Sequence, residues 1–295
     1  MSAAPGPHLL ICTDLDRTLL PNGAQPESAA ARPLFARFTS QQGITLAYAS
    51  GRHRTLVEEA IAIYELPSPD WVIGDVGTTL YRVQAGRWDP WPSWEEEIAG
   101  DWQGLRAADL QPLFTDLEPL TLQEPARQNR YKLSYTLPLG TPRQELLECM
   151  RLRLRSKGLA ASLIVSVDEP AGLGLLDVLP ERATKLHALE FLMQQQGFEP
   201  DTTLFAGDSG NDLPVLCSAV PSVLVANADA DTIEQAQQQS QQQGTADRFY
   251  LARGGFLGMN GNYAAGILEG IAHFHPQTHA VMEAALHALP GPAPC

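Results

Sequence analysis

The sequence predicts an α/β protein with a parallel-sheet core and an inserted α+β domain. Short apolar runs of strand length end abruptly in polar residues, and helical segments separate them, a spacing typical of right-handed βαβ units. The middle third of the chain differs, with clustered tryptophans and alternating strands. The chain has 295 residues, of which 44% are hydrophobic, so it is long enough for both parts.

The first half of the core is expected to contain three strands and two helices. The apolar runs at 8–13 and 44–49 have the length of buried strands, and a shorter run lies at 71–73. Helix-forming residues fill 26–42 and 54–64. Strands and helices therefore alternate here, as a parallel sheet requires.

The insertion is predicted over residues 82–170, as a cap with its own antiparallel sheet. All five tryptophans fall between positions 71 and 102. Segment 130–137 alternates as a half-buried strand does, 141–157 is expected to be a helix, and 162–167 a strand.

The α/β pattern returns after the insertion. The expected elements are strands at 177–179, 203–206 and 222–226, and a helix at 183–196 that ends at Gly197. The Gln-rich segment 234–243 is a solvated helix face or a loop. We therefore assign 1–81 and 171–275 to a discontinuous core and 276–295 to a C-terminal tail.

Charge and cysteine usage exclude several classes of protein. The net charge of −14 disfavours binding to nucleic acid or anionic lipid, which needs dense Lys and Arg. No apolar run approaches the roughly 20 residues of a membrane span, and no signal peptide is visible. The four cysteines, at 12, 149, 217 and 295, have neither zinc nor disulfide-framework spacing. We expect a cytoplasmic, thiol-reduced protein.

Asp14 and Asp16 directly follow the first apolar strand, in the run Asp14-Leu15-Asp16-Arg17-Thr18. The strand ends of α/β sheets are where active sites form. An ionised Asp can attack phosphorus without a base, provided that a cation offsets the repulsion between anions. A second carboxyl can protonate an ester leaving group. The alternative is a turn with capping carboxylates.

Three other strand ends or helix starts carry polar residues. Asp208, Asn211 and Asp212 follow the strand at 203–206 and offer the hard oxygen ligands that suit Mg²⁺. Ser50 and Gly51 follow another strand and could hold a phosphate oxygen. Lys185 opens a helix, where its ammonium could pair with Asp14 and a phosphoryl group. Taken singly, these features also fit a Gly-rich turn, an N-cap serine and an exposed helix lysine.

The order Asp-x-Asp-x-Thr, Ser-Gly-Arg, Lys, Gly-Asp-x-x-Asn-Asp resembles that of the haloacid-dehalogenase-like (HAD) phosphohydrolases. The resemblance extends from residue 8 to about 275. It implies a Rossmann-like core, catalysis through an aspartyl-phosphate, and a type-two cap, because the insertion lies between the Ser and Lys motifs.

A narrower resemblance, to the sucrose-phosphate phosphatases, is carried by 130–135 (RYKLSY), 176–185 (LDVLPERATK) and 265–274 (AGILEGIAHF). That family hydrolyses sucrose 6′-phosphate with Mg²⁺, which implies a role in sucrose biosynthesis. Alternatives are a phosphatase for another glycosyl phosphate (mannosylfructose phosphate, glucosylglycerol phosphate), a general sugar phosphatase, a phosphomutase, or a non-catalytic partner of a sugar-phosphate synthase.

The resemblance also implies residue roles. Asp14 would be the nucleophile, Asp16 the general acid and then base, and Thr18 would steady their loop. The phosphate-binding residues would be Ser50, Gly51, Lys185 and Asn211. The Mg²⁺ site would comprise Asp14, Asp16 through its backbone carbonyl, Asp208 and Asp212. Arg52 and Lys132 would contact the substrate.

The cap and one loop leave alternatives open. Trp88, Trp91, Trp94 and Trp102 could supply aromatic faces for a sugar, or could form the core of the cap itself. Lys132 could equally be an exposed strand lysine. The Gly-rich loop 253–263 could influence substrate choice or be a surface insertion. We expect a monomer whose partner is a small-molecule sugar phosphate. Contact with a sucrose-phosphate synthase is left open.

Overall fold

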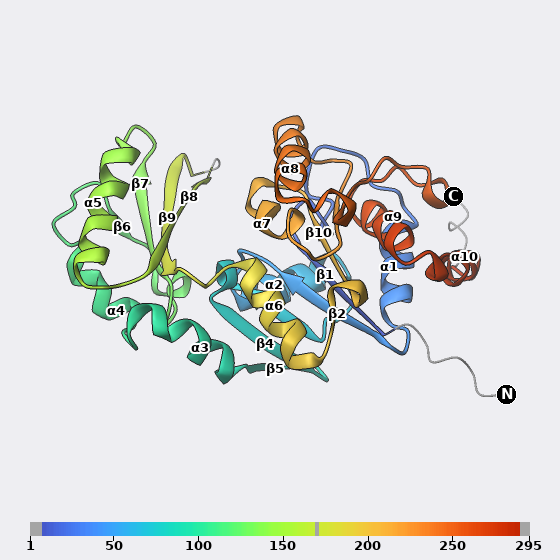
Figure 1. Cartoon of the computed structure of the whole chain (residues 1–295), viewed down its shortest axis with the longest axis horizontal. Helices are drawn as coiled ribbons and strands as arrows, with labels where there is room; N and C mark the ends of the chain where they lie inside the picture. The colour runs from blue at the N-terminus through green and yellow to red at the C-terminus, as the bar shows by residue number, and fades with distance from the viewer. Residues whose placement is uncertain (1–7, 169–170, 290–295) are drawn as a thin grey trace.

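The computed structural model describes residues 8–168 and 171–289 and shows two lobes of unequal size (Figure 1). The larger lobe is built on an eight-stranded sheet and the smaller on a four-stranded sheet. The expected α/β core with an inserted α+β cap is confirmed.

The larger sheet has the order β12-β11-β10-β1-β2-β3-β4-β5. Its first six strands are parallel, and the two at the β5 edge are antiparallel to their neighbours. The strands are β1 (Leu9–Thr13), β2 (Ile44–Ala49), β3 (Trp71–Gly74), β4 (Thr79–Gln84), β5 (Arg87–Pro90), β10 (Thr203–Gly207), β11 (Ser222–Leu224) and β12 (Phe249–Leu251).

Helices cover both faces of this sheet, because its central strands are apolar on both sides. In β1, Leu9 and Ile11 face one hydrophobic cluster, and Leu10 and Cys12 face another. The first face is covered by α1 (Ala31–Thr39), α2 (Arg54–Ile63), α9 (Ala264–Phe274) and α10 (His279–His287). The second is covered by α6 (Lys185–Gln196), α7 (Leu213–Leu216) and α8 (Ala230–Gln243).

The smaller lobe is an antiparallel sheet of order β6-β7-β9-β8. Its alternating apolar side chains, such as Leu133, Tyr135 and Val178, pack against Met150 and Leu154 of the long helix α5. The elements are α3 (Pro92–Ala99), α4 (Ala107–Leu110), β6 (Thr121–Leu122), β7 (Leu133–Pro138), α5 (Arg143–Ser156), β8 (Ala161–Asp168) and β9 (Leu173–Pro180). The helix α5 lies on the side of the sheet away from the core (Figure 1).

Sheet pairing places the lobe boundaries at different residues from those predicted. The core does not end at 81, because β4 and β5 extend the large sheet to Pro90. It does not resume at 171, because β9 pairs with β7 and β8 in the cap sheet. The tail 276–295 includes α10, whose Met282 and Ala285 are buried in the core, and residues 290–295 lie outside the described part. No helix in the described ranges has the length and apolarity of a membrane span.

Candidate active site

The central strand β1 carries Asp14 to the edge of the sheet where β2 and β10 also end. The backbone N–H of Asp14 donates to the carbonyl of Ala206 at 2.9 Å, which continues the ladder with β10. The Asp14 side chain is only 5% exposed. The parallel register thus gathers the polar ends of three strands from distant parts of the sequence.

Lys185 joins two of the predicted acids. It is the first residue of α6, which is capped by Thr184, whose hydroxyl accepts from the His187 N–H at 3.1 Å. Its Nζ donates to Asp14 Oδ1 and to Asp212 Oδ1, both at 2.7 Å. Burial alone would lower the pKa of Lys185, but the two carboxylates outweigh it and raise that pKa above its ordinary value. Lys185 is therefore a fixed positive charge beside Asp14.

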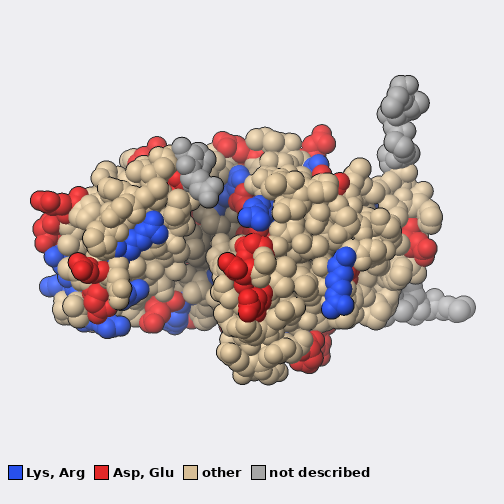
Figure 2. All heavy atoms as spheres, turned by 90° about the horizontal axis from the view of Figure 1, so that it is seen from above, with Lys and Arg blue, Asp and Glu red and all other residues tan. Residues whose placement is uncertain are grey.

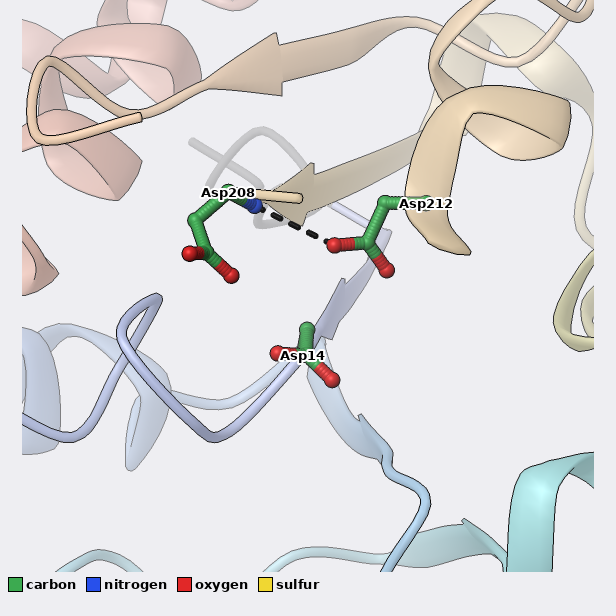
Figure 3. A group of neighbouring side chains, drawn as sticks. All are labelled: Asp14, Asp208 and Asp212. Carbon is green, nitrogen blue, oxygen red and sulfur yellow. Dashed lines mark hydrogen bonds between the residues drawn. The ribbon is translucent and has the colours of Figure 1, made fainter. Parts of the chain in front are cut away.

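The loop after β10 supplies the other two acids. Asp212 folds back so that its Oδ2 accepts from the backbone N–H groups of Asp208 and Ser209, at 3.2 and 3.3 Å. Gly207 permits this turn, since a Cβ there would lie 2.7 Å from the Asp212 carboxylate. Figure 3 shows Asp14, after β1, converging with Asp208 and Asp212 of the loop after β10.

These three carboxylates fit a divalent metal ion. Each can offer an oxygen, and the oxygens lie within 4.8 Å of one another. Burial, opposed by Lys185, raises the pKa of Asp14 to about 8. Burial and the neighbouring charge of Asp212 raise the pKa of Asp208 to about 6. A hard cation would relieve this crowding of buried negative charge.

Thr18 lies between Asp14 and the acidic loop after β10. Its hydroxyl, fully buried, lies 3.1 Å from Asp208 Oδ1 and 3.4 Å from Asp14 Oδ2. This position agrees with the expected role of Thr18 in steadying the loop that carries Asp14.

Asp16 is not part of the cluster of three carboxylates and pairs instead with Arg52. The guanidinium of Arg52 donates twice to it, at 2.6 and 2.8 Å, and Asn22 donates at 2.8 Å. Burial opposes ionisation, but these donors hold the pKa of Asp16 below its ordinary value. Arg52, predicted to bind substrate, here binds the predicted general acid.

A cavity of about 290 Å³ opens over Asp14 and Asp208. Gly51 and Asn211, both predicted to bind phosphate, line it, and so do Asp16 and Arg52. Asn211 is held by Ser209, whose hydroxyl donates to it at 2.9 Å, and it lies 3.5 Å from Lys185 Nζ. Ser50 is buried beside the cavity, and its Oγ accepts from the Arg52 N–H at 3.1 Å.

The structure does not bring Lys132 to this cavity. Among the described residues, the lining does not include Lys132. The side chain is buried, with its Nζ 3.6 Å from Asp75 Oδ1 at the end of β3. Three of the tryptophans also pack inward: Trp94 and Trp102 are fully buried and Trp88 is buried, so they stabilise the lobes. Trp91 is half-buried and packs edge-on against Trp71.

Sequence reasoning missed two arginines that line the cavity. Arg17, between Asp16 and Thr18, reaches Asp208, with 3.5 Å between Nε and Oδ2. Arg127 belongs to a short 3₁₀ segment of the cap, Pro125–Arg127, and lines the same cavity from the other lobe. An arginine inside the nucleophile motif was a signal for the first, whereas nothing local marks the second.

The Gly-rich loop 253–263 packs on the core segment that follows the nucleophile. Asn260 and Asn262 both donate to the carbonyl of Pro26, at 2.8 and 3.0 Å. Asn227 links the two segments, because it donates to the Arg17 carbonyl at 2.6 Å and accepts from the Tyr263 N–H at 2.8 Å. The loop therefore supports the chain around Arg17.

With this geometry established, comparison with known proteins identifies the family. The family model for sucrose-6F-phosphate phosphohydrolases matches residues 7–275. The chain belongs to this family. Both the expected family and the expected class of enzyme, a HAD-type phosphoric monoester hydrolase, are confirmed.

Individual relatives agree with this family. A HAD-like hydrolase from Nitrosococcus oceani is 52% identical over 275 residues, which cover 93% of this chain and 74% of that protein. Sucrose-phosphatase 1 from Nicotiana tabacum is 28% identical, over 77% of this chain and 52% of its own, so the chain spans about half the length of this plant relative. The sucrose-phosphatase of Synechocystis sp. PCC6803, solved with sucrose and phosphate, superposes with a TM-score of 0.70 at 27% identity, covering 91% and 98% of the two chains.

Proposed function

We propose that this sucrose-6F-phosphate phosphohydrolase family member is a Mg²⁺-dependent phosphatase that hydrolyses sucrose 6′-phosphate to sucrose and phosphate. The observation that carries the proposal is the Lys185 ammonium fixed between Asp14 and Asp212 beneath the cavity. It leaves Asp14 at the floor of a water-accessible site with a cation beside the attacking oxygen, as phosphoryl transfer requires.

In the first step, a carboxylate oxygen of Asp14 attacks phosphorus and the ester P–O bond breaks. Asp16 gives its proton to the departing sugar oxygen. In the second step, Asp16 accepts a proton from a water molecule. The water oxygen attacks phosphorus, the bond to Asp14 breaks, and phosphate leaves.

Charge stabilisation comes from several parts of this site. Lys185, Gly51 and Asn211 would hold the phosphoryl oxygens; Gly51 and Asn211 line the cavity, and Lys185 Nζ lies 3.5 Å from Asn211. Asp14, Asp208 and Asp212 are the residues that would hold Mg²⁺. The ion would offset the charge of the carboxylates and of the phosphoryl oxygens.

The pairing of Asp16 with Arg52 sets a condition on this mechanism. Because Arg52 holds Asp16 ionised, the substrate must displace that contact before Asp16 can carry the proton of the first step. Asp16 without its proton is already suited to the second step, in which it acts as a base.

The test is phosphate release by the purified protein, with Mg²⁺ and then with EDTA. The substrates are sucrose 6′-phosphate, mannosylfructose phosphate, glucosylglycerol phosphate, glucose 6-phosphate and fructose 6-phosphate. We expect a strong, EDTA-sensitive preference for sucrose 6′-phosphate. A preference for another substrate would overturn the sucrose assignment but keep the chemistry, and no release from any substrate would overturn the phosphatase assignment.

A further inference from the structure

Three arginines line the cavity over Asp14, and two of them, one from each lobe, are not bound to Asp16 as Arg52 is. Arg17 comes from the core loop after the nucleophile, and Arg127 comes from the cap. The space-filling view shows a hollow between the two lobes with basic and acidic atoms along its edge (Figure 2). Arg127 is the cap residue in the lining of this cavity, so it is the cap group best placed to meet a bound substrate.

Both guanidinium groups retain donors for a ligand, unlike that of Arg52. Arg52 makes two short bonds to Asp16. Among the described residues, the side chain of Arg127 pairs only with Glu124, with 3.6 Å between Nε and Oε1. The Arg17 guanidinium is weakly engaged: its buried Nε lies 3.5 Å from Asp208 Oδ2 without a hydrogen bond, and its Nη2 donates to the Asn227 carbonyl at 3.5 Å. The two side chains are 43% and 46% exposed, so they are open to the cavity.

The backbone holds both arginines in place. The Arg127 carbonyl accepts from the Ser134 hydroxyl of β7 at 3.2 Å, and the Gln128 amide donates to the Ser134 carbonyl at 2.8 Å. The Arg17 N–H donates to Asn22 at 2.8 Å, and Asn227 holds its carbonyl. Fixed backbones reduce the entropy lost when these side chains bind a ligand.

The phosphoryl end of the site already has its own set of groups. Gly51 and Asn211 line the cavity beside Asp14, and Lys185 Nζ lies 2.7 Å from Asp14 Oδ1 and 3.5 Å from Asn211 Oδ1. Three carboxylates fit the metal ion. The two arginines are therefore left for the other part of the substrate. A guanidinium offers parallel N–H groups that match two adjacent acceptor oxygens.

We propose that Arg127 and Arg17 are specificity-determining residues that bind the leaving group of the substrate through paired acceptor oxygens. Vicinal hydroxyls of a sugar ring and a carboxylate share this chemistry. The inference rests on the proposed phosphatase function. It assigns substrate selection to one arginine of the cap and one of the core.

The test compares leaving groups of different kinds. The value of kcat/KM is measured with Mg²⁺ for sucrose 6′-phosphate, which offers hydroxyls, for 3-phosphoglycerate, which offers a free carboxylate, and for acetyl phosphate. Before its bond to phosphorus breaks, acetyl phosphate has no hydroxyl and no free carboxylate to bind. The variants are Arg127→Ala, Arg127→Gln and Arg127→Lys. The matched control is Arg151→Ala, because Arg151 lies on α5, on the far side of the cap sheet, and pairs there with Glu148.

The measured quantity is kcat/KM for sucrose 6′-phosphate or 3-phosphoglycerate, whichever the wild type hydrolyses better, divided by kcat/KM for acetyl phosphate. We expect Arg127→Ala and Arg127→Gln to lower this ratio at least about tenfold, chiefly through KM. Arg127→Lys should recover only part of the lost ratio, since a single ammonium cannot replace the planar guanidinium with its parallel N–H groups. Arg151→Ala should leave the ratio within about twofold. The substrate that loses most identifies the oxygens: hydroxyls for sucrose 6′-phosphate, a carboxylate for 3-phosphoglycerate.

Combining Arg17→Ala with Arg127→Ala should give a loss different from the product of the two single losses, because both side chains bind one group.

Two outcomes would contradict the proposal, and they differ from failure of the function itself. An active protein whose ratio is unchanged in Arg127→Ala, or which loses the same factor for acetyl phosphate, overturns the role of Arg127 alone. A wild-type protein that releases no phosphate from any substrate overturns the phosphatase assignment and this inference with it.

Discussion

The core side of the active site and its cap side differ in burial and in how closely their charged side chains are paired. On the core side, Lys185 and Asp212 are almost completely buried and are joined at 2.7 Å. On the cap side, Arg127 is half-exposed and its nearest acid is 3.6 Å away. The reaction depends on a rigid array of buried charges, whereas the choice of substrate is left to side chains with free donors.

Physical chemistry explains why the difference falls this way. A buried charge is costly unless it is paired, so each core residue constrains its neighbours and few substitutions are tolerated. The same low-dielectric surroundings strengthen the interaction of those charges with a phosphoryl group. An exposed arginine costs little to keep or to replace. Specificity can therefore change on the cap without disturbing the chemistry of the core.

Replacement of the nucleophile should have the largest effect. Asp14→Asn keeps nearly the same shape but removes the attacking oxygen anion, so kcat for sucrose 6′-phosphate should fall by about three orders of magnitude or more. The far-ultraviolet circular dichroism spectrum should match that of the wild type. Substantial turnover by this variant would show that the covalent mechanism proposed for the core is wrong.

Lys185→Met should damage both stability and activity. The change leaves Asp14 and Asp212 facing each other without their cation, and breaking a buried ion pair costs about 3–5 kcal/mol. We expect a matching loss in the free energy of unfolding from urea denaturation, and a fall in kcat of about a hundredfold.

The control for that experiment is Lys157→Met, at the exposed end of α5, which should change the unfolding free energy by less than about 0.5 kcal/mol. If Lys185→Met were equally mild, the buried array would not be the source of core rigidity.

The gathering of the core residues at the active site was predictable from sequence because each motif is local. Asp14, Asp208 and Lys185 each follow a strand or open a helix, and parallel strands bring their ends to one edge whatever the rest of the chain does. The pairing of Arg52 with Asp16 was not predictable. The position of a residue after a strand predicts at which edge of the sheet it lies, but not which side chain it contacts there.

The cap itself and its elements β7, α5 and β8 were predicted, but its boundaries and its contacts with the core were not. Apolar β9 fits a core strand as well as a cap strand, and only its pairing with β7 and β8 decides. The depth of Lys132 and the reach of Arg127 depend on how loops fold between lobes. No spacing in the sequence records such contacts, which join residues on separate sheets.

Asn227→Ala should have a moderate effect and shows how far the rigid region extends. Asn227 is 2% exposed and ties Arg17 to the Gly-rich loop. Its removal leaves a carbonyl and an N–H unsatisfied, at a cost of about 1–3 kcal/mol in the free energy of unfolding. Since the Arg17 backbone adopts a left-handed φ of 59°, it should relax without this bond, with a fall in kcat of about tenfold.

Asn227→Asp separates the two bonds, because it keeps the acceptor for Tyr263 but loses the donor to Arg17. A positioning role for Asn227 requires this variant to lose kcat while KM for sucrose 6′-phosphate changes little. Wild-type kcat in Asn227→Asp would limit the role of Asn227 to stability.

The smallest effect concerns the one buried ion pair that joins the two lobes within the described chain, Lys132 with Asp75. Burial raises the pKa of Asp75, and Lys132 opposes that rise, so each charge is tolerated mainly because of the other. Asp75 and Val76 both adopt left-handed φ angles, of 50° and 60°, which residues other than glycine rarely do. This strained turn lies where Lys132 of the cap pairs with the core.

A double-mutant cycle of Lys132→Met and Asp75→Asn measures this coupling. We expect an interaction energy of about 1 kcal/mol in urea unfolding, with the double variant more stable than the sum of the single losses predicts. Because neither residue lines the cavity described above, KM for acetyl phosphate should respond less than KM for sucrose 6′-phosphate, which depends on where the cap lies. Additive losses would mean that the lobes are held together elsewhere. The cap would then be positioned on the core without help from the ion pair between Lys132 and Asp75.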